Sequence, residues 1–243
     1  MNGTVGAVRI VVAGEALIDL VPDGEDALAA HLGGGPFNTA RALGRLDRPV
    51  AYVGRISTDA FGQRLAGRLT ADGVALDACV RTDDPTTLAL VELDERGSAT
   101  YRFYTDGTAA PGLTPAEALA AIPGTSIVHV GSLGLALEPV ADALEALVEA
   151  VDGLVMVDPN CRPAAITDPA AYRERIRRVV ARAYEVRRSL HRSDVEPPQV
   201  LTDDAERQHD GARQQAQHGH RGREPCDLDA SGPVHDEHGD EGG

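Results

Sequence analysis

The chain has 243 residues, a hydrophobic content of 42% and a formal net charge of -15. A chain this acidic repels nucleic acid and anionic lipid, so we predict neither nucleic acid nor a membrane as a partner. Its three cysteines form no disulfide or metal pattern, and the N-terminal apolar run is too short for a signal core or a membrane span, so we expect a cytoplasmic protein.

Up to residue 183, apolar segments alternate with Gly, Pro and Asp. Continuous or alternating apolar runs predict strands, and apolar residues at helical spacing predict helices. In chain order, the predicted elements are a strand at 7–13, a helix at 36–46, a strand at 50–56, a helix at 60–72, a hairpin at 88–93 and 99–104 with its turn at 94–97, a capping box at 114–117, a strand at 126–130, a helix at 139–151, a strand at 154–157 and a helix that opens at 168. This alternation predicts an α/β fold with a mostly parallel sheet flanked by helices, and the hairpin as a separate small sheet.

Polar residues that follow the first strand are candidates for a binding site, because ligands of open α/β sheets bind beyond the carboxyl ends of the strands. Asp19 lies in a short apolar run, where a carboxylate needs partners such as the vicinal hydroxyls of a sugar; a surface-turn aspartate is the alternative. Gly34 and Gly35 allow a ligand to approach a helix N-terminus, and Asn38 can donate and accept toward a polyol. The alternative for this segment is a flexible loop with a helix cap. A packed, hydrogen-bonded side chain is the interpretation for His129, in preference to a catalytic base.

Five short segments carry a resemblance to a known family. They are GGGPFNTA at 33–40, YVGRI at 52–56, DAFG at 59–62, HVGSL at 129–133 and VDPNCRP at 157–163. In order and spacing the chain resembles the PfkB carbohydrate kinases over about residues 8–183. The last segment is most similar to the fructokinase and 2-keto-3-deoxygluconate kinase branch, and Leu17 stands where ribokinases usually have Asn, which argues against ribose.

The resemblance implies a ribokinase-like fold with a small β lid formed by approximately residues 14–32 and 86–113. It also implies ATP- and Mg-dependent phosphorylation of a hydroxyl on a small sugar, fructose or a 2-keto-3-deoxygluconate-like compound, and a possible homodimer through the lid. For Arg102 and Tyr104, which belong to the predicted lid, the alternative is that they are ordinary strand residues. For Arg162 the alternative is a capping or salt-bridge arginine. The residues that the resemblance assigns to the sugar are Asp19, Gly34, Gly35, Asn38, Arg102, Tyr104, Asn160 and Arg162.

Residues 184–243 differ in composition from residues 1–183. They lack the apolar alternation and contain most of the eight histidines. A disordered extension, a His-rich metal-binding tail and an out-of-frame translation are the three interpretations. The resemblance favours the last, because the N-x-x-E magnesium motif and the G-A-G-D loop of the family, with its general-base aspartate, do not follow residue 183. We therefore assign no catalytic residue and no metal ligand, and expect the C-terminal half of the fold to be missing.

Three functions follow from these observations. The first is a sugar kinase whose chain as written has little or no activity. The second is a non-catalytic sugar-binding remnant, which would bind sugar independently of ATP. The third is an unrelated α/β domain whose tail mediates interactions, and no motif supports it.

Overall fold

The computed structural model of the chain describes residues 9–24, 26–93 and 99–191. Its strands are β1 (Arg9–Ala13), β2 (Leu17–Pro22), β3 (Leu28–Gly33), β4 (Val50–Val53), β5 (Arg55–Ser57), β6 (Val80–Thr82), β7 (Leu88–Leu93), β8 (Ala99–Tyr104), β9 (Thr125–Gly131) and β10 (Leu154–Asp158). Its helices are α1 (Gly35–Arg45), α2 (Ala60–Ala71), α3 (Pro115–Leu119), α4 (Val140–Ala150) and α5 (Pro169–His191), with short 3-10 turns η1 (Ala110–Gly112), η2 (Ser132–Leu135) and η3 (Pro163–Ala165).

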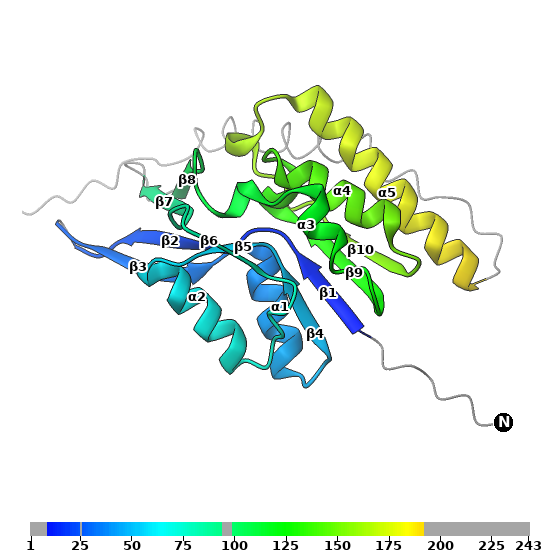
Figure 1. Cartoon of the computed structure of the whole chain (residues 1–243). Coiled ribbons are helices and arrows are strands. Elements are labelled where there is room, and N and C mark those ends of the chain that lie inside the picture. The colour runs from blue at the N-terminus through cyan, green and yellow to red at the C-terminus, as the bar shows by residue number, and fades with distance from the viewer. Residues whose placement is uncertain (1–8, 25, 94–98, 192–243) are drawn as a thin grey trace, which may run out of the picture. The chain divides into compact units, whose positions relative to one another are not determined.

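A parallel sheet with the strand order β10-β9-β1-β4 forms the centre of the described residues. Successive side chains of β1 point to opposite faces, as the period of a strand requires. Val11 packs into an apolar cluster with α3, α4 and α5, whereas Val12 packs into a second cluster with α1 and α2 (Figure 1). The predicted α/β architecture, a parallel sheet flanked by helices, is confirmed.

Strand β10 lies at the edge of the described part of this sheet. It pairs with β9 alone among residues 9–24, 26–93 and 99–191. Val155 of β10 is buried against the α4 and α5 side, but Met156, which points to the opposite face, is 50% exposed. An exposed apolar side chain next to an unpaired edge strand indicates that neither this face nor this edge is covered by the described residues.

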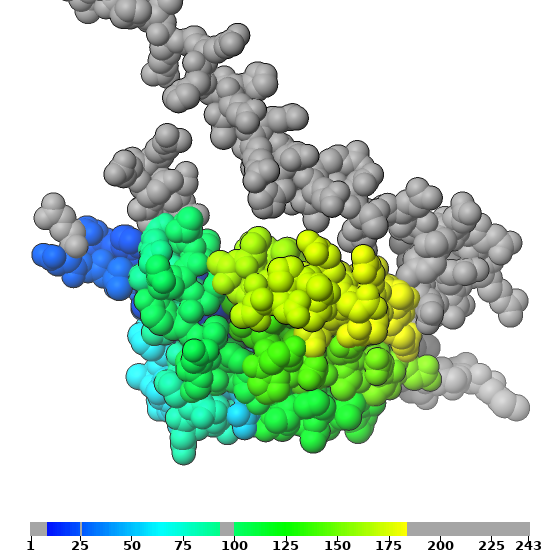
Figure 2. All heavy atoms as spheres, turned by 90° about the horizontal axis from the view of Figure 1, so that it is seen from above, coloured from blue at the N-terminus to red at the C-terminus, as the bar shows by residue number. Residues whose placement is uncertain are grey.

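A second sheet has the strand order β3-β2-β7-β8 and is called the lid sheet below. Its strands come from the two segments predicted to form a lid, 14–32 and 86–113. Strands β7 and β8 pair antiparallel, as the hairpin prediction requires; the predicted turn at 94–97 lies outside the described residues. The β2–β3 hairpin projects beyond the neighbouring surface, as the blue atoms of Figure 2 show.

Two strand predictions need correction. The single strand predicted at 50–56 is two strands in different sheets, β4 beside β1 and β5 beside β6. The chain bends at Gly54, where an added Cβ would lie 2.5 Å from the Gly14 carbonyl oxygen. A continuous apolar run does not reveal such a change of sheet. Strands β2, β3 and β6 were not predicted as strands, because their sequences lack a clear alternation of apolar and polar residues.

The ends of the helices follow local signals in the sequence. The predicted capping box is present, since the Thr114 hydroxyl accepts from the Glu117 amide while the Glu117 carboxylate accepts from the Thr114 amide.

Helix α5 continues past residue 183 to His191, so the predicted domain boundary falls inside this helix. The three interpretations of the tail concern residues 184–243, and of these, residues 192–243 lie outside the described residues. None of the helices in the described part of the chain is long and apolar enough to cross a membrane.

Candidate functional site

A cavity of about 200 Å³ lies between the lid sheet and the carboxyl ends of the central strands. One wall comes from β2 and β8 of the lid sheet. The other comes from the loop before α1, the turn after β9 and the turn after β10. The lining residues are Glu15, Leu17, Asp19, Gly34, Gly35, Asn38, Tyr101, Phe103, Ser132, Leu133, Asn160 and Arg162.

Six of the eight residues predicted to contact a sugar line this cavity. They are Asp19, Gly34, Gly35, Asn38, Asn160 and Arg162. Asp19 and Asn38 in particular face the same cavity, although Asp19 belongs to strand β2 of the lid sheet and Asn38 to helix α1. This agrees with the strand-end rule, because β1, β9 and β10 all end at the same edge of the parallel sheet, where this cavity lies.

The two predicted lid residues, Arg102 and Tyr104, do not line the cavity. In β8 successive side chains alternate between the faces of the lid sheet, and Tyr101 and Phe103 are the ones that face the cavity. Arg102 pairs instead with Glu92 across the outer face, at 2.7 Å, and the Tyr104 side chain is 48% exposed. The residues of β8 that line the cavity are thus one position before each of the two predicted residues.

Each of the three consecutive glycines is required for a different reason. A Cβ on Gly33 would overlap the carboxylate of Asp19. Gly34 has a φ of 110°, which L side chains rarely adopt, and its Cβ would lie 2.6 Å from the Glu15 carbonyl oxygen. A Cβ on Gly35 would lie 3.0 Å from the Ser132 Cβ. The glycines thus let the Asp19 carboxylate, the Glu15 backbone and the Ser132 turn approach one another at the cavity.

Asp19 and Arg162 give the cavity one anionic and one cationic group that are open to a ligand. Burial raises the pKa of the Asp19 carboxyl, while His31 and Arg162 act in the opposite direction. Within the described residues, Asp19 accepts no hydrogen bond and Arg162 forms no ion pair. Asn38 is oriented by Arg41, whose guanidinium lies 3.5 Å from the Asn38 Oδ1. A polyol in the cavity can thus donate to the Asp19 carboxylate and accept from the Arg162 guanidinium.

Glu15, Ser132, Tyr101 and Phe103 line the cavity but were not among the predicted site residues. Glu15 follows Gly14 at the end of β1, and Ser132 follows β9, so the strand-end rule could have found both. At the helix N-terminus that the glycines were predicted to open to a ligand, the Gly35 amide already donates to the Glu15 carboxylate at 3.1 Å. The alternation of β8 could have pointed to the two aromatic residues, but not to the face of the sheet that they occupy.

The whole described region matches a known family model. Residues 8–190 match the model of the pfkB family carbohydrate kinases. The chain belongs to the pfkB family. It is 38% identical over 180 residues to a fructokinase of Rhizobium leguminosarum bv. trifolii, across 72% of this chain and 55% of that protein.

Solved pfkB-type structures have the same fold. The crystal structure of a fructokinase with bound ATP from Xylella fastidiosa superimposes with a TM-score of 0.66 at 29% identity, over 72% of this chain and 56% of that one. A Vibrio cholerae O395 fructokinase double mutant with fructose, ADP and potassium gives a TM-score of 0.63 at 29% identity, over 73% and 58%. The present chain therefore spans between 55% and 58% of the length of these three relatives.

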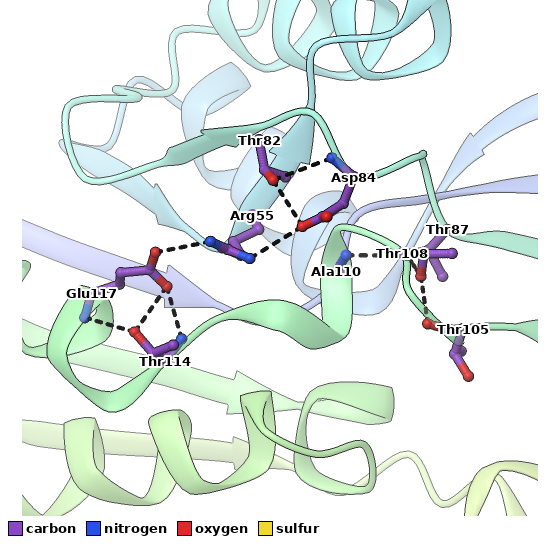
Figure 3. A network of polar contacts seen from close by, with 9 residues as sticks. All are labelled: Arg55, Thr82, Asp84, Thr87, Thr105, Thr108, Ala110, Thr114 and Glu117. Carbon is purple, nitrogen blue, oxygen red and sulfur yellow. Dashed lines mark hydrogen bonds and ion pairs between the residues drawn. The ribbon is translucent and has the colours of Figure 1, made fainter.

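In this pfkB-family chain, a polar network fixes the base of the lid sheet (Figure 3). Arg55, at the start of β5, lies 3.2 Å from Asp84 and 3.2 Å from Glu117, and so joins the segment before β7 to α3. The hydroxyl groups of Thr87 and Thr108 lie 2.7 Å apart, and thus connect the chain that enters β7 to the chain that leaves β8. The pair of strands β7 and β8, of which β8 carries Tyr101 and Phe103, is therefore held to the core at its base.

Two further predictions concern histidine and metal. His129 is half-buried in β9 and does not line the cavity. Its buried Nδ1 has no hydrogen-bond partner among the described residues, so the predicted hydrogen bond is not found at that atom. Burial lowers the His129 pKa, which favours the neutral ring. In the part of the chain that the structure describes, no three His, Cys, Asp or Glu side chains are grouped to hold a metal ion.

Proposed function

We propose that the described residues bind a neutral sugar, and that the whole protein is an ATP-dependent kinase for which fructose is the preferred substrate. The observation that carries this proposal is the convergence of Asp19, Asn38, Asn160 and Arg162 on one cavity of about 200 Å³. Such a mixture of acceptors and donors suits several hydroxyl groups at once. The fructokinase names of the relatives support the same substrate class.

The charge of the lining favours fructose over 2-keto-3-deoxygluconate. Glu15 and Asp19 are acidic, and Arg162 is the only basic residue among those that line the cavity. Since Asp19 already lies in the field of Arg162, a sugar that carries its own carboxylate would gain little attraction and would meet two acids. A neutral ketose meets no such repulsion.

The two walls have different tasks in this proposal. Asp19 accepts hydrogen bonds from sugar hydroxyls, while the side-chain amides of Asn38 and Asn160 both donate and accept. Tyr101 and Phe103 form a stacked pair with ring centroids 6.1 Å apart, and they offer an apolar surface to the C–H groups of the sugar. Arg162 donates from the opposite side of the cavity.

Phosphoryl transfer is proposed for the whole protein, because the chain spans between 55% and 58% of the length of the relatives compared above. ATP and magnesium belong to that proposal, and the fructokinase structures with bound ATP or ADP support the nucleotide. For the chain as given, we propose sugar binding with little turnover. A homodimer through the lid sheet is also proposed, since β3 and β8 are its edge strands in the described residues.

The test is calorimetric titration of the full chain with fructose and with 2-keto-3-deoxygluconate, each with and without Mg-ATP. We expect fructose to bind more tightly than the sugar acid. Asp19→Asn should weaken fructose binding about tenfold to a hundredfold, the value of a hydrogen bond to a charged group, while Asp23→Asn, an exposed carboxylate on the same hairpin, should not. Absence of fructose binding, or equal binding by both Asp variants, would refute the proposed site. Normal turnover of fructose by the chain as given, in a coupled assay with Mg-ATP, would refute the proposed low activity.

A further inference from the structure

Glu15 is the most deeply buried charged group of the cavity. Its side chain is 2% exposed, and it forms no ion pair within the described part of the chain. A buried carboxylate without a cation is costly unless its oxygens accept hydrogen bonds. Here the two oxygens accept separately: Oε1 accepts from the Gly35 amide at 3.1 Å, and Oε2 accepts from the Gly134 amide at 3.0 Å.

These two amides belong to parts of the chain that are far apart in sequence. Gly35 is the first residue of α1, whereas Gly134 lies in η2, after β9. Both glycines pack closely: a Cβ on Gly134 would lie 2.8 Å from Leu144, and one on Gly35 would lie 3.0 Å from Ser132. The carboxylate therefore ties the glycine loop to the turn after β9, at a spacing that leaves no room for larger residues.

The same carboxylate is connected to the turn after β10. Burial raises the pKa of the Glu15 carboxyl, and the nearby Ser132 hydroxyl acts in the opposite direction. The Asn160 Nδ2 lies 3.5 Å from the Ser132 Oγ. Ser132 and Asn160 have φ values of 58° and 35°, which residues other than glycine seldom adopt. Such conformations persist only where the surroundings hold them, so the chain of contacts from Glu15 through Ser132 to Asn160 stabilises both turns.

We propose that Glu15 is a positioning residue of the sugar site, an internal anion that holds the glycine loop, the Ser132 turn and Asn160 in the arrangement that a ligand meets. Each of its two oxygens accepts one backbone amide, so the carboxylate is fixed between the two segments that carry these amides. The proposal rests on the proposed sugar site for its ligand readout only. The arrangement of the two turns can be measured without a ligand.

Cys161 supplies that second readout. It lies between Asn160 and Arg162, and its side chain is exposed. Burial and the nearby Cys161 thiol raise the pKa of the Tyr172 hydroxyl. If the Asn160 turn loosens, the thiol moves away from Tyr172 and should react faster with iodoacetamide. Peptide mass mapping of the labelled full chain separates Cys161 from Cys79 and Cys226. The pKa of the Cys79 thiol is raised to about 11 by burial, so that thiol should react slowly.

The test compares Glu15→Gln with Glu145→Gln. The first keeps the size of the side chain but turns a nitrogen donor toward a backbone amide, so one amide loses its acceptor. The second removes a carboxylate that pairs with Arg175 on α5, remote from the cavity. We expect Glu15→Gln to weaken fructose binding about tenfold or more and to speed Cys161 alkylation severalfold. Glu145→Gln should change neither, although it should lower the melting temperature.

Each outcome is decisive. Wild-type Cys161 reactivity in Glu15→Gln, or equal acceleration in both variants, overturns the proposal. If the wild-type chain binds no sugar but Glu15→Gln still accelerates alkylation, the proposed function fails and the positioning role stands. If Glu15→Gln does not fold, Ser132→Ala replaces it. That variant should accelerate Cys161 alkylation too, and an unchanged rate in it overturns the proposal.

Discussion

The two walls of the cavity are built in different ways. The core wall consists of turns in which Gly34, Ser132 and Asn160 have positive φ values, and buried hydrogen bonds to Glu15 hold these turns together. The lid wall consists of ordinary strand residues, Asp19, Tyr101 and Phe103, whose side chains project from a pleated sheet. Changes in the core wall should therefore cost both folding stability and binding. Changes in the lid wall should cost binding alone, except where the lid is anchored.

The largest effect is expected at Gly34. Alanine at this position would need a φ of 110°, and its Cβ would lie 2.6 Å from a backbone oxygen of Glu15. We expect Gly34→Ala to lower the free energy of unfolding by about 1–3 kcal/mol and to abolish sugar binding. Urea denaturation and calorimetric titration measure the two quantities.

Gly24 supplies the matched control for Gly34. Its φ is 85°, but an added Cβ would meet nothing within 4 Å, because the residue lies on the exposed turn between β2 and β3. Gly24→Ala should therefore show the backbone strain without the clash, and retain sugar binding. Equal losses of stability in the two variants would mean that the close approach to Glu15 contributes nothing, and that the core wall is no more constrained than an exposed turn.

A smaller effect is expected at Asp59, which anchors the lid wall to the core. Its carboxylate caps α2 by accepting from the Gly62 amide, and it also accepts from the amide and hydroxyl of Thr86, just before β7. These hydrogen bonds hold the pKa of Asp59 at about 2, below its ordinary value of 3.8, although burial acts in the opposite direction. Asp59→Ala should lower the free energy of unfolding by about 1 kcal/mol at pH 7, as the loss of a helix cap does.

The pH dependence of that loss follows from the direction of the shift. A carboxylate whose pKa is lower in the folded state stabilises the fold above its unfolded pKa, and this contribution disappears as the pH falls through the folded value. The difference between wild type and Asp59→Ala should therefore shrink between pH 4 and pH 2, the interval set by these two pKa values. Asp59→Asn, which keeps an acceptor for the cap, should lose less at pH 7. A difference that stays constant down to pH 2 would exclude the ionised carboxylate as the source of the anchor.

The two walls also differ in how well the sequence predicts them. Asp19 and Asn38 could be predicted from local patterns, because Asp19 lies in a short apolar run after the first predicted strand and Asn38 lies at a helix start, whereas Arg162 was predicted from the family resemblance. The strand-end rule could have placed Glu15 at the cavity, but it could not predict which groups the Glu15 carboxylate binds. One of its two backbone partners is the Gly134 amide, 119 residues away, and no local pattern records that contact. The division of 50–56 into two strands was not predicted for a related reason, because a run of apolar residues does not indicate which sheet each part of it joins.

For the lid wall, the sequence could not predict which face of strand β8 points toward the core. The alternation in β8 correctly indicates that Arg102 shares a face with Tyr104, and that Tyr101 shares one with Phe103. It does not indicate which face meets the core, because either choice satisfies the period of two. Burial of Phe103 against Leu17 and Leu133 decides the choice, and that packing exists only in the folded chain.

The smallest predicted effect tests this assignment of faces directly. Tyr101 and Tyr104 are 43% and 48% exposed, so they are matched in residue type and burial but lie on opposite faces of β8. Tyr101→Ala should weaken fructose binding about threefold to tenfold, the value of one aromatic contact, with the free energy of unfolding changed by less than about 0.5 kcal/mol. Tyr104→Ala should leave the affinity unchanged. The reverse result would place the sugar on the outer face of the lid sheet, and would return the lid contact to the residues that the sequence first suggested.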